Sequence, residues 1–523
     1  MNLTSQSIDP ARAAGPRHSA APRGLNRLPL ALAIAGTVLL GAGCAVTPKP
    51  LAADALASAA STEREALIAG QEAPAAPVTL EEALARTLKY NLDYRVKLME
   101  EALGQRQLDL SNIDLLPRVV AGAGYGARSN DMASSSVDAV TGRQSLVPSY
   151  SSERTRYSAD LGLSWNVLDF GVSYYAAQQQ ADRALILQER RRRVAHQLVQ
   201  QVRQQWWLAL GAQRLEAPIE ALLAKANAAL ADSRTIEQEQ LRTPLESLGF
   251  QRQLLDSIRQ LTLVRNTLVQ AKPRLAALMN VTPGRGFDVA PPAALTVPTL
   301  GIDLAQAEQL ALTGRPELVE ARYNERIGVA ETRKAMAKLL PGLELSIGNH
   351  YDSNRYLVNQ GWADAGLRVS WNLLNLFNAG TIRGAANAQL EIAREQKLAL
   401  GMAVLTQVNV AWIDYEGRRR QYELESDVAN VEQRILAQNN MAVEANAQSR
   451  LQAISAGASA VLSQLRLYQS YGDLQNAYGQ IGASLGLDPL PTEAAGLDLP
   501  ALTQAFAGAE ARWQSRLVGT GAQ

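Results

Sequence analysis

The sequence predicts an α+β membrane protein in which two similar halves each join a short β-hairpin to a very long helical hairpin. Three observations lead to this fold class. Segments of about ten residues alternate apolar with polar or small side chains. Two segments of about 70 residues have the composition of continuous helices. The two halves of the chain also align with one another, so we expect an internal tandem duplication.

Composition and charge exclude several functional classes. The 523 residues include 51 basic and 50 acidic side chains, which leaves a formal net charge of +1. A nucleic-acid-binding protein would carry a basic excess or stripe. One cysteine and three histidines are too few for a disulfide framework or a Cys/His zinc site in one chain. The run from His350 to Ser353 contains triad-like residues, but a triad requires convergence in space rather than adjacency in sequence. We therefore predict no catalytic, cofactor-binding or metal site and no enzymatic activity.

The N-terminus has the pattern of a secretion signal. Arginines are scattered over residues 12–27, and residues 28–40 are apolar without a charge. This apolar stretch is too short to span a membrane, so residues 1–43 are predicted to be a signal peptide.

Cys44 follows Gly41-Ala42-Gly43, which resembles a bacterial lipoprotein processing site, although Gly41 stands where such sites usually have leucine. The resemblance implies acylation of Cys44, including palmitate, and residues 44–77 would form a lipid-anchored leader. Ala45 replaces the aspartate that retains lipoproteins at the inner membrane, so the resemblance implies delivery to the outer membrane. The alternative is an unmodified cysteine at an ordinary cleavage site.

Two offsets bring the halves of the chain into register. A shift of 224 residues aligns Gly104 with Gly328 and Leu116-Pro117 with Leu340-Pro341. A shift of 206 residues aligns Ser164-Trp165-Asn166 with Ser370-Trp371-Asn372. The resulting domain boundaries are a first repeat at 78–280, a proline-rich strap at 281–301, a second repeat at 302–488 and a C-terminal tail at 489–523.

Each repeat is expected to open with a helix, at 80–114 and 304–338. Thr79 and Asp303 can cap the N-termini of these helices, and a proline ends each segment. Four strands follow from the alternating patterns, at 119–125, 157–167, 343–350 and 363–373. The stretches between paired strands, 128–156 and 352–360, are rich in Ser, Asn and Asp and are expected to be loops.

The alternation is typical of strands in outer-membrane barrels. Trp165 and Trp371 stand near strand ends, which suits an interfacial aromatic girdle. Four strands cannot close a barrel, and an open sheet edge in lipid leaves backbone groups unpaired. Three chains would supply 12 strands, within the even-numbered range of bacterial barrels. The alternative is a soluble sheet with one face packed on a helical core.

Long helices follow the strands, from Ser173 to Leu241 and from Thr381 to Ile454, and only the first contains a proline, Pro218. Return helices are expected at 245–279 and 458–485, with apolar residues spaced by three and four as in antiparallel coiled coils. The turns between the long and return helices are predicted at Thr243-Pro244 and at Ser455-Ala456-Gly457-Ala458.

This arrangement resembles the TolC-type outer membrane factor family, in its lipoprotein branch, from about residue 78 to residue 488. The matching features are the Leu-Pro turn, the Ser-Trp-Asn strand end and the Ala-Gly-Ala-Ser segment at 456–459. The resemblance implies a homotrimer with a 12-stranded β-barrel in the outer membrane and an α-helical coiled-coil tunnel in the periplasm.

The resemblance also implies a function: a passive exit duct of a tripartite efflux pump that exports small molecules. It implies docking on a periplasmic adaptor protein through the tips of the two helical hairpins, at Thr243, Pro244, Gly457 and Ser459. It also implies an inner-membrane transporter as a partner. Two alternatives remain: the outlet of a type I protein secretion system, and a periplasmic coiled-coil structural lipoprotein.

Overall fold

The computed structural model describes residues 48–74, 77–145, 147–166, 169–239, 243–282, 284, 286–292, 294–444, 450–491 and 496–518. The predicted signal peptide and Cys44 lie outside the described residues. The chain divides into two compact units, Met1–Leu67 and Ile68–Gln523. Helix α2 (Ala53–Ile68), which has no buried residue, makes up most of the described part of the first unit.

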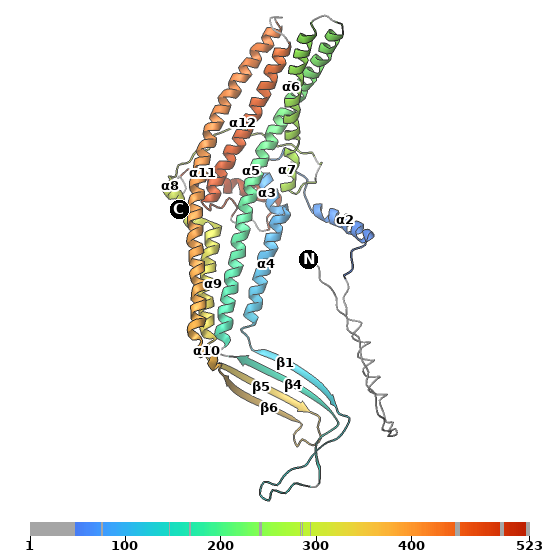
Figure 1. The fold of residues 1–523 in the computed structure, drawn as a ribbon, viewed down its shortest axis with the longest axis vertical. Helices are drawn as coiled ribbons and strands as arrows, with labels where there is room; N and C mark the ends of the chain where they lie inside the picture. The colour runs from blue at the N-terminus through green and yellow to red at the C-terminus, as the bar shows by residue number, and fades with distance from the viewer. Residues whose placement is uncertain are drawn as a thin grey trace, which may run out of the picture. The chain divides into compact units, whose positions relative to one another are not determined.

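The second unit repeats one order of elements (Figure 1). In each series two helices lead into strands, and the strands lead into a long helix and a return helix. The first series comprises α3 (Leu80–Tyr90), α4 (Leu92–Ile113), β1 (Arg118–Ala127), β4 (Thr155–Asn166), α5 (Asp169–Gln238), α6 (Pro244–Val269) and α7 (Ala271–Leu278). The second comprises α8 (Leu304–Gly314), α9 (Pro316–Ala337), β5 (Gly342–Asp352), β6 (Gly361–Ser370), α10 (Leu373–Phe377), α11 (Ala379–Glu444) and α12 (Arg450–Ser484). Helix α13 (Leu499–Leu517) follows.

The four predicted strands form one antiparallel sheet in the order β1-β4-β5-β6. Two details differ from the prediction. The last strand ends at Ser370, because the side chain of Asn372 accepts hydrogen bonds from the next backbone amides and caps α10. A small hairpin of β2 (Met132–Ser134) and β3 (Ser149–Ser152) forms within the segment predicted to be a loop.

The opening helices form as predicted but are broken at equivalent positions. Thr79 and Asp303 cap their N-termini through side-chain hydrogen bonds. Asn91 interrupts the first helix, because its side chain caps α4 by accepting from the Tyr94 amide at 3.1 Å. Arg315 interrupts the second, where Pro316 occupies the first turn of α9. Asn91 and Arg315 are 224 residues apart, the same offset that aligns the repeats.

Both predicted long helices form, and α5 continues through Pro218, but α11 ends at Glu444 rather than at the predicted Ile454. Helix α5 packs against α4, α9, α6 and α12, while α11 packs against α9 and α12. The apolar seam of α6 is buried as expected; its buried members are Leu254, Leu261, Val264 and Leu268.

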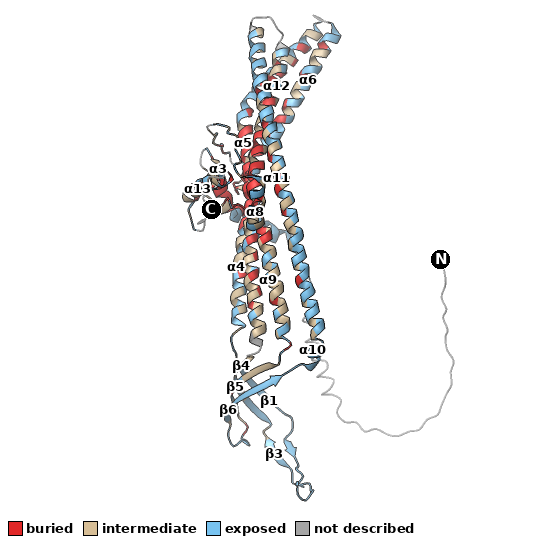
Figure 2. Cartoon of the chain, turned by 90° about the vertical axis from the view of Figure 1, so that its left-hand side faces the viewer, coloured by how far each residue is buried: buried red, intermediate tan, exposed pale blue. Residues whose placement is uncertain are grey.

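The hydrophobic core lies within the helices, and the sheet contributes little to it (Figure 2). Rings from three helices meet there: Trp207 of α5 lies edge-to-face with Tyr471 of α12, and Tyr478 of α12 lies edge-to-face with Trp513 of α13. Trp513 is 3% exposed. The segment predicted only as a C-terminal tail therefore contains a helix that completes the core.

Candidate channel wall and helical tips

One face of the sheet is apolar and uncovered. The strand register places alternate residues on the same face. Every residue of β1 and of β6 is exposed. The apolar face comprises Val119, Tyr125, Tyr157, Leu161, Leu163, Leu345, Ile347, Leu367 and Val369. Nothing in the described part of the chain covers this face, so it must contact either lipid or another molecule.

The opposite face carries small and polar side chains. These include Gly122, Gly124, Ser158, Asp160, Ser164, Ser346, Gly348, His350, Asp364 and Gly366, and the apolar Val120 and Trp362 are the exceptions on this face. This division into an apolar and a polar face is the alternation of barrel strands, with apolar side chains toward lipid and polar side chains toward the lumen.

A His–Asp cluster joins three strands on the polar face. His350 of β5 lies with Nδ1 2.7 Å from Asp160 Oδ1 of β4 and Nε2 3.1 Å from Asp364 Oδ1 of β6. The imidazole also stacks on Trp362 at a centroid distance of 5.3 Å. A neutral imidazole has one N–H, so when both carboxylates are ionised the two contacts are both hydrogen bonds only if the ring is doubly protonated. The partners of His350 are thus side chains of neighbouring strands rather than the adjacent Asp352 and Ser353.

Gly348 leaves room for this cluster. A Cβ atom at that position would lie 2.5 Å from both Asp364 Oδ1 and His350 Nε2. The directly opposed residue on β4, Gly162, has no atom within 4 Å of the corresponding position. Sequence reasoning missed the cluster, although the alternating pattern already placed His350 on the polar face.

Both outer edges of the sheet are unpaired. Strand β1 pairs only with β4, and β6 pairs only with β5, in the described part of the chain. Each edge therefore presents a row of backbone N–H and C=O groups, which is a template for pairing with another chain.

Trp165 and Trp371 lie at the same end of the sheet, beside the start of the long helices. Trp165 is opposite Leu345, near the end of β4. Trp371 follows β6 directly, and its Nε1 donates a hydrogen bond to the Leu339 carbonyl at 2.9 Å. The two tryptophans therefore lie at the same level along the strands, as two residues at one membrane–water interface must. The girdle itself stays a prediction.

The first helical turn lies where the sequence predicts it. Helix α5 ends at Gln238, and α6 begins at Pro244 with Thr243 as its N-cap. Two apolar side chains follow on the surface, since Leu245 is 82% and Leu248 51% exposed. The position of the turn is confirmed, and docking at Thr243 and Pro244 stays a prediction.

The second turn was predicted at the wrong place. Helix α11 ends at Glu444 and α12 begins at Arg450, so residues 455–458 lie inside α12. Gly457 is buried, and a Cβ there would lie 2.9 Å from Cδ1 of Leu222 on α5. The run of small residues at 455–458 thus allows close helix packing and does not form a turn. Gly457 and Ser459 are consequently not at the tip.

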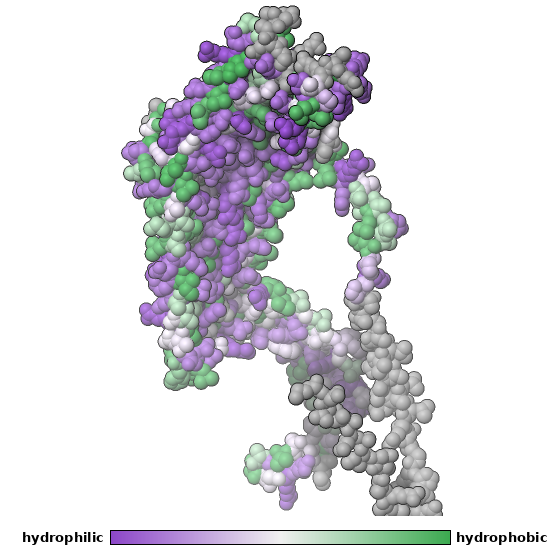
Figure 3. All heavy atoms as spheres, turned by 45° about the horizontal axis from the view of Figure 1, so that its top comes forward, coloured by the Kyte–Doolittle hydropathy of each residue, from purple (hydrophilic) through white to green (hydrophobic). Residues whose placement is uncertain are grey.

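We call the helices of the second unit together the helical body. Exposed apolar stripes run along two of these helices. On α4 they comprise Val96, Met99, Leu103, Leu110 and Ile113. On α11 they include Met402, Val410, Ile413, Leu424 and Val431. Green hydrophobic patches accordingly interrupt the hydrophilic surface of the helices in Figure 3. By length and composition alone α11 could cross a membrane, and it is the only such helix among the described residues.

The charged residues of the body form pairs between helices rather than a metal centre. Asp182 of α5 pairs with Arg326 of α9, and Glu325 of α9 pairs with Lys397 of α11 at 2.5 Å. No group of three or more His, Cys, Asp or Glu side chains in the described ranges is arranged to hold a metal ion.

No protein-family profile and no curated protein sequence matches the chain. Solved structures do. The CmeC outer-membrane channel of Campylobacter jejuni matches with a TM-score of 0.64 at 13% identity, over 84% of this chain and 94% of that chain. A membrane protein from Pseudomonas aeruginosa matches with a TM-score of 0.62 at 17% identity, over 80% and 92%. The outer-membrane protein VceC of Vibrio cholerae matches with a TM-score of 0.58 at 12% identity, over 78% and 96%.

These likenesses cover 78–84% of this chain and 92–96% of the solved chains. They confirm the expected fold of the single chain, whereas the trimer and its 12-stranded barrel stay predictions. This chain has the fold of the outer-membrane channels.

Proposed function

We propose that three copies of this chain form an outer-membrane channel that serves as the passive exit duct of a tripartite efflux pump for small molecules. The observation that carries the proposal is a four-stranded sheet with one uncovered apolar face and two free edges. Backbone groups at a lipid-exposed edge must find partners. Pairing β1 of one copy with β6 of the next satisfies both edges and closes a barrel of 12 strands.

The helical body supports the same assembly. In a ring of three copies, the exposed apolar stripes of α4 and α11 would pack against neighbouring copies and extend the barrel as a helical tunnel. The apolar composition of α11 then reflects burial between copies rather than a membrane span.

A duct without an energy source requires partners in the cell envelope. We place an inner-membrane transporter and a periplasmic adaptor in this role. Leu245 and Leu248 beside the first turn support a docking surface, because exposed apolar residues at a helical tip can bury against a partner. Acylation of Cys44 would add an anchor in outer-membrane lipid.

Native mass and conductance test the assembly. The protein, extracted from outer membranes in detergent, is expected to have three times the mass of the acylated chain and to give discrete single-channel currents in planar bilayers. A Cys44→Ser variant separates the anchor from the barrel, and we expect it to remain in the membrane fraction. A monomer without pore activity, whose Cys44→Ser variant is released by washing without detergent, would instead support the structural lipoprotein.

Dye accumulation in the native host tests export. Deletion of the gene should raise ethidium accumulation, and the wild-type gene should restore the low level. Leu245→Asp with Leu248→Asp should fail to restore it while leaving trimer mass and conductance unchanged. Normal dye levels in the deletion strain together with retention of a secreted protein would favour the type I secretion outlet.

A further inference from the structure

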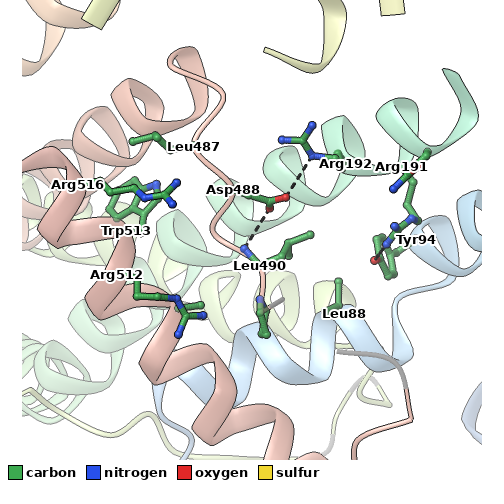
Figure 4. Close-up of a pocket in the computed structure, with 13 residues that line it drawn as sticks. Leu88, Tyr94, Arg191, Arg192, Leu487, Asp488, Leu490, Arg512, Trp513 and Arg516 are labelled. Carbon is green, nitrogen blue, oxygen red and sulfur yellow. Dashed lines mark hydrogen bonds and ion pairs between the residues drawn. The ribbon is translucent and has the colours of Figure 1, made fainter. Parts of the chain in front are cut away.

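A cavity of about 760 Å³ lies beside helix α13 in the helical body (Figure 4). Its wall comes from α3, α4, α5, α13 and the connector that follows α12. Arg512 and Arg516 of α13 line one side, and Arg191 and Arg192 of α5 line the other. Among the described residues that line the cavity, Asp488 supplies the one carboxylate. A chain with a net charge of +1 thus concentrates four arginines around one cavity.

The arginines of α5 are already neutralised. Arg191 pairs with Glu101 at 2.5 Å. Arg192 pairs with Glu189 at 2.6 Å and with Asp488 at 3.2 Å. Burial acts to raise the pKa of Asp488, but His196, whose Nε2 lies 3.5 Å from Asp488 Oδ1, and the charge of Arg192 together lower it. Asp488 is therefore ionised at neutral pH and is committed to these partners.

The arginines of α13 are exposed and lack a carboxylate partner in the described part of the chain. No described residue forms an ion pair or a side-chain hydrogen bond with Arg512 or Arg516. The two residues are four positions apart on one helix, which places their side chains about 5–6 Å apart at Cβ. Guanidinium groups bind carboxylates and phosphates through paired N–H donors, so these two groups together match a doubly charged anion.

Part of the remaining cavity wall is apolar, and Gln188 and Tyr94 add polar groups to it. Leu88, Leu487, Leu490, Pro491 and Ala509 line it beside the guanidinium groups. An inorganic ion would leave this surface in contact with water, whereas a ligand with an apolar moiety would cover it.

The position of the cavity argues against a lipid headgroup. Arg192 lies 23 residues into α5, which begins at the end of the sheet. At a rise of 1.5 Å per residue this is about 35 Å along the helix. In the proposed function the sheet spans the membrane. A lipid phosphate at the end of the sheet that adjoins α5 then cannot reach the cavity.

We propose that this cavity binds a small organic dianion, a phosphate ester or a dicarboxylate, whose apolar moiety packs against Leu88 and Leu490. The ligand is a soluble molecule of the compartment that surrounds the helices. Only this last placement rests on the proposed function, since the binding chemistry does not depend on export.

Isothermal titration of the purified full-length protein in detergent tests the proposal with phenyl phosphate as the probe. We expect saturable binding with at least fivefold higher affinity than for inorganic phosphate, and no binding of the neutral analogue phenol. Arg512→Gln with Arg516→Gln should weaken binding by at least about tenfold, because two charge-assisted contacts are lost. The corresponding double lysine variant keeps the charge but not the paired donors. Its affinity for phenyl phosphate should lie between those of the wild type and the double glutamine variant.

Arg420→Gln provides the matched control. Arg420 lies on α11 away from the cavity, is exposed, and has no ion-pair partner among the described residues. This variant should bind phenyl phosphate like the wild type, and all variants should retain the wild-type mass and melting temperature. Absence of binding to the wild type, or equal binding to the double glutamine variant, would overturn the proposal. Competition by an anionic phospholipid added to the detergent micelles would overturn the soluble ligand in favour of a headgroup. Channel activity is not measured, so failure here is distinct from failure of the export function.

Discussion

In helix α12, Tyr471 is 2% and Leu474 0% exposed, whereas in strand β6, Leu367 is 68% and Val369 65% exposed. The same residue types are therefore buried within the chain in the helical body and uncovered in the sheet. Burial of an aliphatic or aromatic side chain contributes about 1.5–3 kcal/mol to the free energy of unfolding. The helical body gains this stabilisation from contacts within one copy. The sheet must obtain it from lipid and from other copies.

The largest effect is expected in the core of the helical body. Tyr471→Ala would remove a ring that packs against Trp207 and Tyr422, together with the hydrogen bond from its hydroxyl to the Thr296 carbonyl at 2.9 Å. We expect the free energy of unfolding to fall by about 3–5 kcal/mol, as for other buried aromatics. Chemical denaturation in detergent, followed by near-UV circular dichroism, measures this change.

Tyr351→Ala in strand β5 is the control from the sheet, where the ring is 47% exposed. It should lower the stability of the helical body by less than about 1 kcal/mol, because it touches no part of that core. Equal losses in the two variants would show that sheet and body unfold as one unit.

The next largest effect separates the two faces of the sheet. Leu161 and Gly162 are adjacent near the middle of β4, with Leu161 on the apolar face and Gly162 on the polar face. Leu161→Arg should cost about 2–4 kcal/mol of folding into lipid vesicles, because a charge would face hydrocarbon. Gly162→Arg should insert normally, since a Cβ there meets no atom within 4 Å. Equal insertion of both variants would rule out a lipid-facing apolar side.

Sequence patterns predicted the sheet well because its two faces meet different surroundings. A period of two survives only where one side contacts an apolar medium and the other does not, and all four strands show it. The caps at Thr79 and Asp303 could be predicted because capping depends on local sequence. Each residue caps the helix that follows it through its own side chain.

The failures are in places where tertiary packing decides. Gly457 belongs to a run of small residues that looks like a turn, but its lack of a side chain allows α12 to approach Leu222. Phe506 and Trp513 make α13 part of the core, although the segment resembles a tail in sequence. The partners of His350 lie 190 and 14 residues away, and strand register alone brings them together. The break at Arg315 could have been predicted, because the residue before a proline disfavours helix.

A smaller effect tests the His–Asp cluster on the polar face. Gly348→Ala would push a methyl group against His350 and Asp364, and we expect a loss of about 1–2 kcal/mol of sheet stability from this overpacking. Gly162→Ala, directly opposite in the ladder, should be neutral or slightly stabilising. Thermal melting of the sheet by infrared amide bands compares the two. Equal melting temperatures would mean that the His350 contacts contribute nothing to strand pairing.

The smallest effect concerns a charge contact of the helical body and its dependence on pH. The hydrogen bond from Lys397 lowers the pKa of Glu325, burial opposes this, and Arg394 adds to the lowering. A lowered pKa in the folded state means that the contact stabilises the protein above the unfolded value of about 4.3 and that this contribution is lost as the pH falls through the folded pKa. Glu325→Gln should therefore cost at most about 1 kcal/mol at pH 7 and flatten the fall in stability between about pH 5 and pH 3.

Denaturation midpoints measured across this pH range test the expectation, with Glu395→Gln as the control. Glu395 is exposed on α11 and has no ion pair with any described residue. Its substitution should change neither the stability at pH 7 nor the steepness with which stability falls as the pH is lowered. The pair between Glu325 and Lys397 links α9 to α11, so a small but measurable effect would show that the body also gains from contacts within one copy that lie outside its apolar core. If the two variants behave alike, this link contributes nothing, and burial alone accounts for the difference between body and sheet.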